Sequence, residues 1–130
     1  MRGIAILLLS AGLTGCASIN LCSDFQGVRV EDGHEPVATV EIANSGWYLF
    51  NCLPLGSGDP DHPDGGCRLF TDTVTLDNNL KVLAHALATT GAGGFCNLTS
   101  RVTEENYFFI LVKHRIYRTS AVLLKKEEMK

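Results

Sequence analysis

The sequence predicts an α+β fold, in which one helix packs on a small antiparallel sheet in the order β-β-loop-α-β-β-β. Three observations support this fold class. Residues 76–90 have the periodicity of an amphipathic helix, the flanking segments have the composition of strands, and a proline- and glycine-rich stretch separates the first strands from the helix. A single helix among strands is typical of a two-layer α+β domain.

Two strands are expected before the loop. Residues 37–43 alternate apolar and polar side chains, as a half-buried strand does. The turn-forming residues 44–46 then end this strand, and the aromatic segment 47–50 predicts a second short one. Residues 54–66 are rich in proline, glycine and aspartate, so we expect a surface loop there.

This loop carries groups that can bind a divalent cation. Its candidate metal ligands are Asp59, Asp61, His62 and Asp64. The calcium-loop pattern is not met, because Pro63 stands at its fifth position, Asp64 replaces the glycine of its sixth and Phe70 replaces the glutamate of its twelfth. Two interpretations stay open: a metal- or small-ligand site, or a solvated, turn-rich loop.

The helix is expected to begin after Thr75, a suitable N-cap, and to end at Gly91. Its expected packed face is apolar: Leu76, Leu80, Leu83, Ala84 and Leu87. Its expected solvent face is polar: Asn78, Lys81, His85 and Thr89. This pattern predicts that one stripe of the helix lies on the sheet.

Three strands are expected after the helix. Residues 96–103 carry β-branched side chains, and residues 104–106 predict a turn. Residues 107–112 form a continuous apolar run, which is typical of a central strand covered on both faces. Residues 113–115 predict a turn or bulge before a last strand over 116–124.

The N-terminus has the three-part plan of a secretory signal, with a basic Arg2, about ten mostly apolar residues and then small residues. Such a run is too short to span a bilayer, which takes about 20 helical residues. Its last four residues, Leu13-Thr14-Gly15-Cys16, resemble the lipobox of bacterial lipoproteins. The resemblance covers the first sixteen residues. It implies that residues 1–15 are removed and that the Cys16 thiol receives a diacylglycerol; the alternative is an ordinary signal with a chance cysteine.

The chain is expected to divide into four segments: a signal peptide at 1–15, a lipidated tether at 16–35, a single α+β domain at 36–124 and a flexible tail at 125–130. Lipid on Cys16 makes a membrane the expected partner, because two or three acyl chains hold a protein firmly. In the family, retention at the inner membrane goes with aspartate after the cysteine. Ala17 at that position favours the outer membrane, facing the periplasm of a Gram-negative bacterium.

The four remaining cysteines are expected to form disulfides in an oxidising compartment: Cys22, Cys52, Cys67 and Cys96. Three complete pairings are possible. We favour Cys52–Cys67, which closes a loop of about 15 residues and would contribute about 3 kcal/mol. Cys22–Cys96 then follows by elimination. A zinc site built from His62, Cys67 and Cys52 would compete with the Cys52–Cys67 bridge.

Composition and motifs argue against several functions. The net charge is −3 and the basic stretch 113–118 suits a solvated strand edge, so we expect no nucleic-acid partner. No G-x-S-x-G motif is present and the histidines follow no metal-ligand spacing, so we expect neither an enzyme nor a cofactor.

The interpretation that remains is a small non-enzymatic envelope lipoprotein with a structural or partner-binding role. The aromatic residues Trp47, Tyr48 and Phe50 are the candidate contacts for an envelope protein partner, or else part of the core. The alternative function is a metal- or small-ligand-binding periplasmic module that uses residues 54–66.

Overall fold

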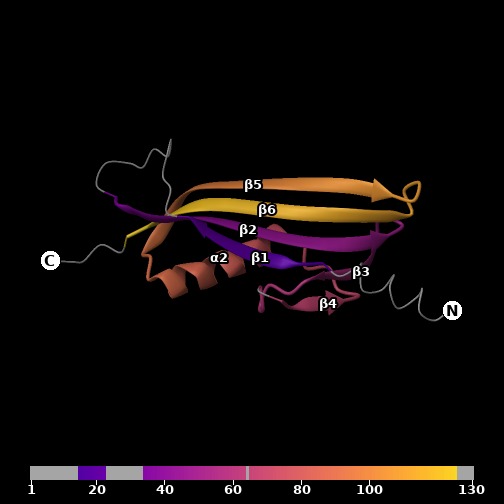
Figure 1. The fold of residues 1–130 in the computed structure, drawn as a ribbon, viewed down its shortest axis with the longest axis horizontal. Coiled ribbons are helices and arrows are strands. Elements are labelled where there is room, and N and C mark those ends of the chain that lie inside the picture. Colours follow the sequence, from indigo (N-terminus) through magenta and orange to yellow (C-terminus); the bar gives the residue numbers. More distant parts are fainter. Residues whose placement is uncertain (1–14, 23–33, 64, 126–130) are drawn as a thin grey trace.

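The computed structural model describes residues 15–22, 34–63 and 65–125. Its elements, in chain order, are β1 (Ala17–Cys22), β2 (Pro36–Leu49), β3 (Leu53–Gly58), β4 (Cys67–Leu69), α2 (Leu76–Thr90), β5 (Gly94–Tyr107) and β6 (Val112–Leu124). The strands form one antiparallel six-stranded sheet in the order β4-β3-β2-β6-β5, with β1 also paired to β2 (Figure 1). β1 and β3 therefore share one edge of β2, whereas β6 pairs along its other edge.

The expected α+β fold class was wrong, because the described chain is mostly antiparallel sheet, with 57% strand and 15% helix. Three of the expected turns lie inside long strands: residues 44–46 in β2, 104–106 in β5 and 113–115 in β6. Pairing with a neighbouring strand through these segments overrides their local turn preference. The breaker-rich loop is also partly strand, since β3 begins at Leu53 and pairs with both β2 and β4.

The expected tether is not loose at its start. Residues Ala17–Cys22 form β1 and pair with β2 from Asn44 to Thr39. Residues 23–33 of the tether lie outside the described residues, as does most of the expected tail. The first tail residue, Lys125, donates its backbone N–H to the carbonyl of Glu35 at 2.8 Å.

The core lies between α2 and one face of β2 and β6. Its buried side chains are Val40 and Ile42 from β2, Val82, Leu83 and Ala86 from α2, and Ala121 and Leu123 from β6. The expected helix ends are confirmed: Thr75 accepts a hydrogen bond from the Asn78 N–H, and Gly91 adopts a left-handed φ of 69°. The packed face is rotated from the expected one, because Asn79 is buried whereas Leu76 and Ala84 are exposed.

The apolar segment 107–112 is not a central strand. Residues 108–111 form the turn between β5 and β6, at one end of the long hairpin (Figure 1). The pairs that close this hairpin are Tyr107 with Val112 and Asn106 with Lys113. The apolar run therefore marks an exposed tip, and the strands on either side of it are polar and alternating.

Candidate functional site

Cys16 is exposed and held directly by the sheet. Its backbone N–H donates to Ser45 Oγ at 3.0 Å, and its carbonyl accepts from the Ser45 N–H at 2.8 Å. An acylated amine keeps one N–H, so amide formation preserves the donor to Ser45. The backbone contacts of Cys16 are therefore compatible with lipid on both its sulfur and its nitrogen.

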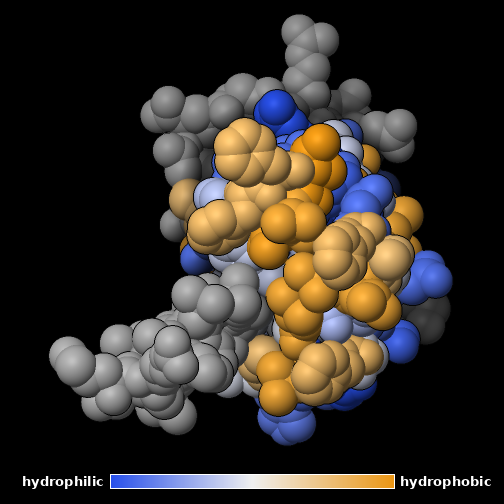
Figure 2. Space-filling model, turned by 90° about the vertical axis from the view of Figure 1, so that its right-hand side faces the viewer, coloured by the Kyte–Doolittle hydropathy of each residue, from blue (hydrophilic) through white to orange (hydrophobic). Residues whose placement is uncertain are grey.

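Exposed apolar side chains gather at the end of the sheet where β2 meets β3 and β5 meets β6 (Figure 2). We call this surface the apolar end and define it by Phe50, Leu53, Leu69, Phe70, Tyr107, Phe108, Phe109, Ile110 and Leu111. These are nine of the fifteen exposed large hydrophobic residues in the described part of the chain. Phe109 at the hairpin tip is fully exposed, at 101%. Such a concentration marks an interaction surface, because single exposed apolar residues are normally scattered.

The hairpin tip holds these side chains in an unfavourable backbone conformation. Phe108, Phe109 and Ile110 have φ values of 51°, 54° and 83°. The left-handed region costs a residue with a side chain about 1–2 kcal/mol, so glycine or asparagine is the usual choice there. Strained residues that persist in this way concentrate at functional sites.

An aromatic cluster lies behind the tip, on the sheet face opposite α2. The Trp47 ring stacks on His114 with centroids 4.4 Å apart, and its centroid is 5.3 Å from that of Tyr107. The Tyr107 hydroxyl donates to Glu105 at 2.8 Å, which raises the pKa of the phenol. Burial lowers the pKa of His114, against the opposing charge of Glu105.

Charged side chains alternate with this cluster along the strands and lie on the other face of the sheet. Glu104 accepts from Lys113 Nζ at 3.0 Å and from Arg115 Nε at 2.8 Å, and these two bonds lower the pKa of its carboxyl. The end of the sheet is therefore purely apolar at the tip, and behind the tip the aromatic cluster lies on one face and the ion pairs of Glu104 lie at overlapping levels on the other.

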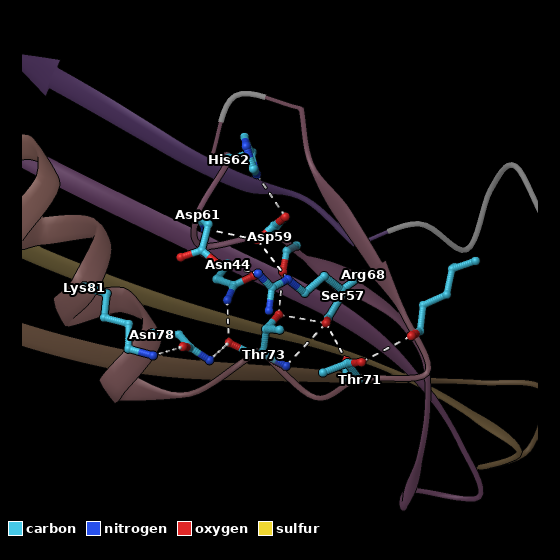
Figure 3. Close-up of polar contacts among 12 residues, drawn as sticks. Asn44, Ser57, Asp59, Asp61, His62, Arg68, Thr71, Thr73, Asn78 and Lys81 are labelled. Atoms are coloured by element: carbon cyan, nitrogen blue, oxygen red, sulfur yellow. Dashed lines mark hydrogen bonds and ion pairs between the residues drawn. The ribbon is translucent and has the colours of Figure 1, made fainter.

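The loop with the candidate metal ligands is organised by an arginine (Figure 3). Asp59 accepts from Arg68 Nε at 2.9 Å and lies 3.2 Å from His62 Nδ1, while the same guanidinium pairs with Asp61. Burial opposes ionisation of Asp59, but the Asp61 N–H, His62 and Arg68 together lower the pKa of its carboxyl. The structure thus brings three of the four predicted ligands together around a cation of the chain itself.

A metal would have to displace Arg68 from these carboxylates. Within the described ranges, no group of three or more histidine, cysteine, aspartate or glutamate residues is arranged to hold a metal ion. Asp64, the fourth predicted ligand, lies outside the described residues.

A pocket of about 760 Å³ lies between β1, α2 and the end of this loop. His62 and Asp61 line it from the loop, and His85 lines it from α2. Its apolar lining includes Ile19 and Leu21 of β1. The pocket therefore offers both imidazole and hydrocarbon surface to a small ligand.

The structure separates the three aromatic residues that the sequence groups as a partner site. Tyr48 is 2% exposed and donates to Asp72 at 2.6 Å, and burial raises the pKa of its phenol. Trp47 points to the opposite face and joins the aromatic cluster, whereas Phe50 belongs to the apolar end. Alternation along β2 explains why neighbours in sequence reach different surroundings.

No disulfide joins any two of the five cysteines. Cys52 precedes β3 and Cys67 pairs with its last residue, so about 20 Å separate the two at about 3.3 Å per residue. Cys22 and Cys96 lie three strand spacings apart, about 14 Å. A disulfide needs Cα atoms within about 7 Å, so both favoured bridges are incompatible with this sheet.

Sequence reasoning missed the tip residues 108–111, because it took their apolar run as a buried strand. The signal that identifies them is the pattern on either side. Residues 99–107 and 112–120 are two polar, β-branched segments of equal length, and a hairpin folded about 108–111 pairs them along their whole length.

Within the described ranges, no helix combines the length and apolar character that crossing a membrane requires. No family model matches this chain, and no curated protein or solved structure matches it either.

Proposed function

We propose that this protein is a non-enzymatic envelope lipoprotein, anchored through lipid on Cys16 to the periplasmic side of the outer membrane of a Gram-negative bacterium. Its role is structural or partner-binding, and its sheet domain works at the bilayer surface. One observation carries the proposal: Cys16, the residue that the lipobox resemblance selects, is exposed and lies directly before β1. The acyl chains therefore attach to the folded domain with no intervening linker.

The environment of Gly15 adds a condition on the order of events. Gly15 is buried, and a Cβ on it would clash with the Ser45 carbonyl oxygen and lie 2.6 Å from Ser57 Cα. The bond between Gly15 and Cys16 is thus packed against β2 and β3 in the folded chain. A peptidase needs an accessible, extended bond, so removal of the signal precedes docking of β1.

The intact mass of membrane-extracted protein tests the anchor. We expect a chain that begins at Cys16 and carries acyl groups, and metabolic labelling with radioactive palmitate that is lost in Cys16→Ser. The matched control is Cys52→Ser, another exposed cysteine, which keeps the label. A chain that still starts at Met1, or a label that survives Cys16→Ser, contradicts the proposal.

A second candidate function is small-ligand or metal binding in the pocket beside α2. The observation that favours it is that His62 of the loop and His85 of α2 line the same pocket. Titration calorimetry with Zn²⁺ is the direct test, with His85→Ala expected to abolish the heat and His34→Ala, away from this pocket, to retain it. Equal heats for the two variants, or no heat for the parent protein, remove this candidate.

A further inference from the structure

We propose that the apolar end is a second membrane contact, which inserts its turn residues among the headgroups and upper acyl chains of a phospholipid bilayer. The inference rests on the proposed function, because the lipid on Cys16 is what brings this bilayer to the domain. It assigns the exposed turns an occupant of defined chemistry, a fluid phospholipid surface.

The apolar end lies close to the anchor. A Cβ on Gly58 would lie 2.6 Å from the carbonyl carbon of Cys16, and Gly58 pairs with Cys67, two residues before Leu69. One strand spacing and two residues make about 10 Å between Cys16 and Leu69. Along β2, Phe50 lies five residues beyond Ser45, the partner of Cys16, or about 17 Å. Both distances are shorter than half the thickness of a bilayer, about 20 Å with its headgroups.

The absence of slack between anchor and sheet makes contact unavoidable. Cys16 is bonded to Ser45 through its own backbone, and β1 starts at Ala17. Acyl chains that are buried in the membrane therefore hold this part of the sheet at headgroup level. Of the surfaces near Cys16, the apolar end is the one whose exposure to water is unfavourable.

The order of side chains along the hairpin follows the polarity profile of a bilayer. The tip contains four consecutive apolar residues, 108–111, with no charge among them. Trp47 and Tyr107 lie behind the tip, and these two residue types are enriched at membrane interfaces. Glu104 and Arg115 lie one pair farther from the tip than Trp47, on the side of water, and Lys113, which lies nearer the tip, directs its ammonium away from it to Glu104. A protein partner would require no such gradient.

The shape of the apolar end also suits a fluid partner. Phe109 in the hairpin turn is fully exposed, and Phe50 and Leu69–Phe70 add exposed apolar side chains from other segments of the chain. Protein interfaces need a complementary surface of about 800 Å² on each partner, whereas lipid chains adapt to projecting groups. Some backbone groups of the tip already have hydrogen-bond partners in the protein. The Leu111 carbonyl accepts from the Phe50 N–H, and the Leu111 N–H donates to the Phe108 carbonyl. Insertion is therefore shallow, at a depth where water completes the remaining hydrogen bonds.

The test places a tryptophan at each end of the same hairpin. Phe109→Trp reports the tip, and Phe95→Trp is the matched control, because Phe95 is also exposed but pairs with Leu123 at the opposite end. Each lipidated, full-length mature protein is reconstituted into phosphatidylcholine vesicles whose acyl chains are brominated close to the headgroup. Trp47, the one native tryptophan, contributes the same background to both.

We expect a blue-shifted emission at position 109 that loses about half of its intensity in brominated vesicles, since insertion reaches about 5–10 Å into the acyl boundary. After subtraction of the parent protein's Trp47 signal, the tryptophan at position 95 should keep its emission. Protein that floats with the vesicles but shows no quenching at position 109, or equal quenching at both positions, overturns the insertion and leaves the anchor in place. If position 109 is not quenched and chemical crosslinking joins the tips of two molecules, the insertion is overturned and the surface is a contact between two copies of the chain. Protein without acyl mass that fails to float overturns the proposed function.

A second variant separates insertion from folding. The double change Phe108→Ser with Phe109→Ser removes only exposed side chains, so the urea midpoint should fall by no more than the assay error. Transfer of the lipidated protein between vesicles should become at least about ten-fold faster, because less apolar surface holds it. The control Phe95→Ser should transfer at the parent rate. Equal transfer rates for the tip variant and the parent overturn the inference.

Discussion

Ile110 combines, in a single residue, the two features of the hairpin tip, which are exposure and strain. Its side chain is 68% exposed and its φ is 83°. A β-branched residue is rarely found at such an angle, because its Cβ substituents crowd the backbone. A turn selected for stability alone would carry glycine or asparagine here, so the apolar residue is kept at a cost in folding free energy.

The substitution Ile110→Gly is expected to stabilise the fold. Relief of the left-handed strain stabilises the folded state by about 1–2 kcal/mol. The greater conformational entropy of glycine in the unfolded chain offsets about 0.4–1 kcal/mol of this, so the free energy of unfolding should rise by about 0.5–1 kcal/mol. Urea denaturation measures this as a higher midpoint. Ile116→Gly, inside β6, serves as the control and should destabilise. A lower midpoint for Ile110→Gly means that the side chain packs on the domain.

His114 gives the fold a pH dependence near neutrality. Burial against Trp47 lowers its pKa below the usual value of 6.5, and Glu105 opposes this only in part. The unfolded chain therefore takes up a proton first as the pH falls. The stabilisation is complete above about pH 6.5 and is lost progressively below it.

Urea midpoints between pH 8 and pH 5 are expected to fall as the medium is acidified, before the carboxyl groups titrate. His114→Phe keeps an aromatic ring beside Trp47 and should remove this slope. The control is His85→Phe on the exposed face of α2, which should retain it. A slope that persists in His114→Phe assigns the pH dependence to another group.

Among the elements, α2 shows what local sequence can and cannot predict. Its two ends were predictable because each depends on a single residue, the cap at Thr75 and the left-handed Gly91. Its buried face was not, because that face depends on where the sheet lies. Asn79 is fully buried and donates to the Tyr117 carbonyl and the Thr119 hydroxyl, and this pairing across the interface turns the polar residue inward.

Two leucines of α2 test the corrected packing. Leu83 is 1% exposed, so Leu83→Ala should lower the free energy of unfolding by about 3 kcal/mol. Leu76 belongs to the same expected apolar face but is 37% exposed, so Leu76→Ala should cost less than about 1 kcal/mol. Chemical denaturation of both variants provides the comparison. Equal losses would restore the helix face expected from periodicity.

The strands show the opposite behaviour. Their presence in these segments was predictable from the sequence, but the residues at which they end were not. Asn44, Ser45 and Gly46 have the composition of a turn, yet β2 runs through them because β6 pairs along one edge and β1 and β3 pair along the other. Asn44 also donates its side-chain amide to the Thr73 carbonyl at 2.6 Å, deep in the sheet face (Figure 3). Long-range pairing of this kind leaves little trace in a local window of sequence.

At the scale of the whole molecule, the continuous sheet determines whether the cysteines can form disulfides. The lipobox resemblance led to an oxidising compartment, and four further cysteines then suggested two bridges. Strand order places Cys22 and Cys96 about 14 Å apart, and the β3–β4 register places Cys52 and Cys67 about 20 Å apart, both beyond the reach of a disulfide. Strand order is a property of the whole fold, which is why cysteine spacing alone could not predict it.

The protein is therefore expected to keep four alkylatable thiols and to melt at the same temperature with and without reductant. Alkylation of denatured, unreduced protein, followed by mass spectrometry, counts the thiols at Cys22, Cys52, Cys67 and Cys96. A Cys52–Cys67 bridge would instead add about 3 kcal/mol that reductant removes. It would also require β4 to slide along β3 by most of that strand, which breaks the pairs Gly56–Leu69, Ser57–Arg68 and Gly58–Cys67. Loss of these pairs would release Arg68 from its position between Asp59 and Asp61. Two missing alkyl groups at Cys52 and Cys67 would thus contradict both the sheet register and the loop that Arg68 organises.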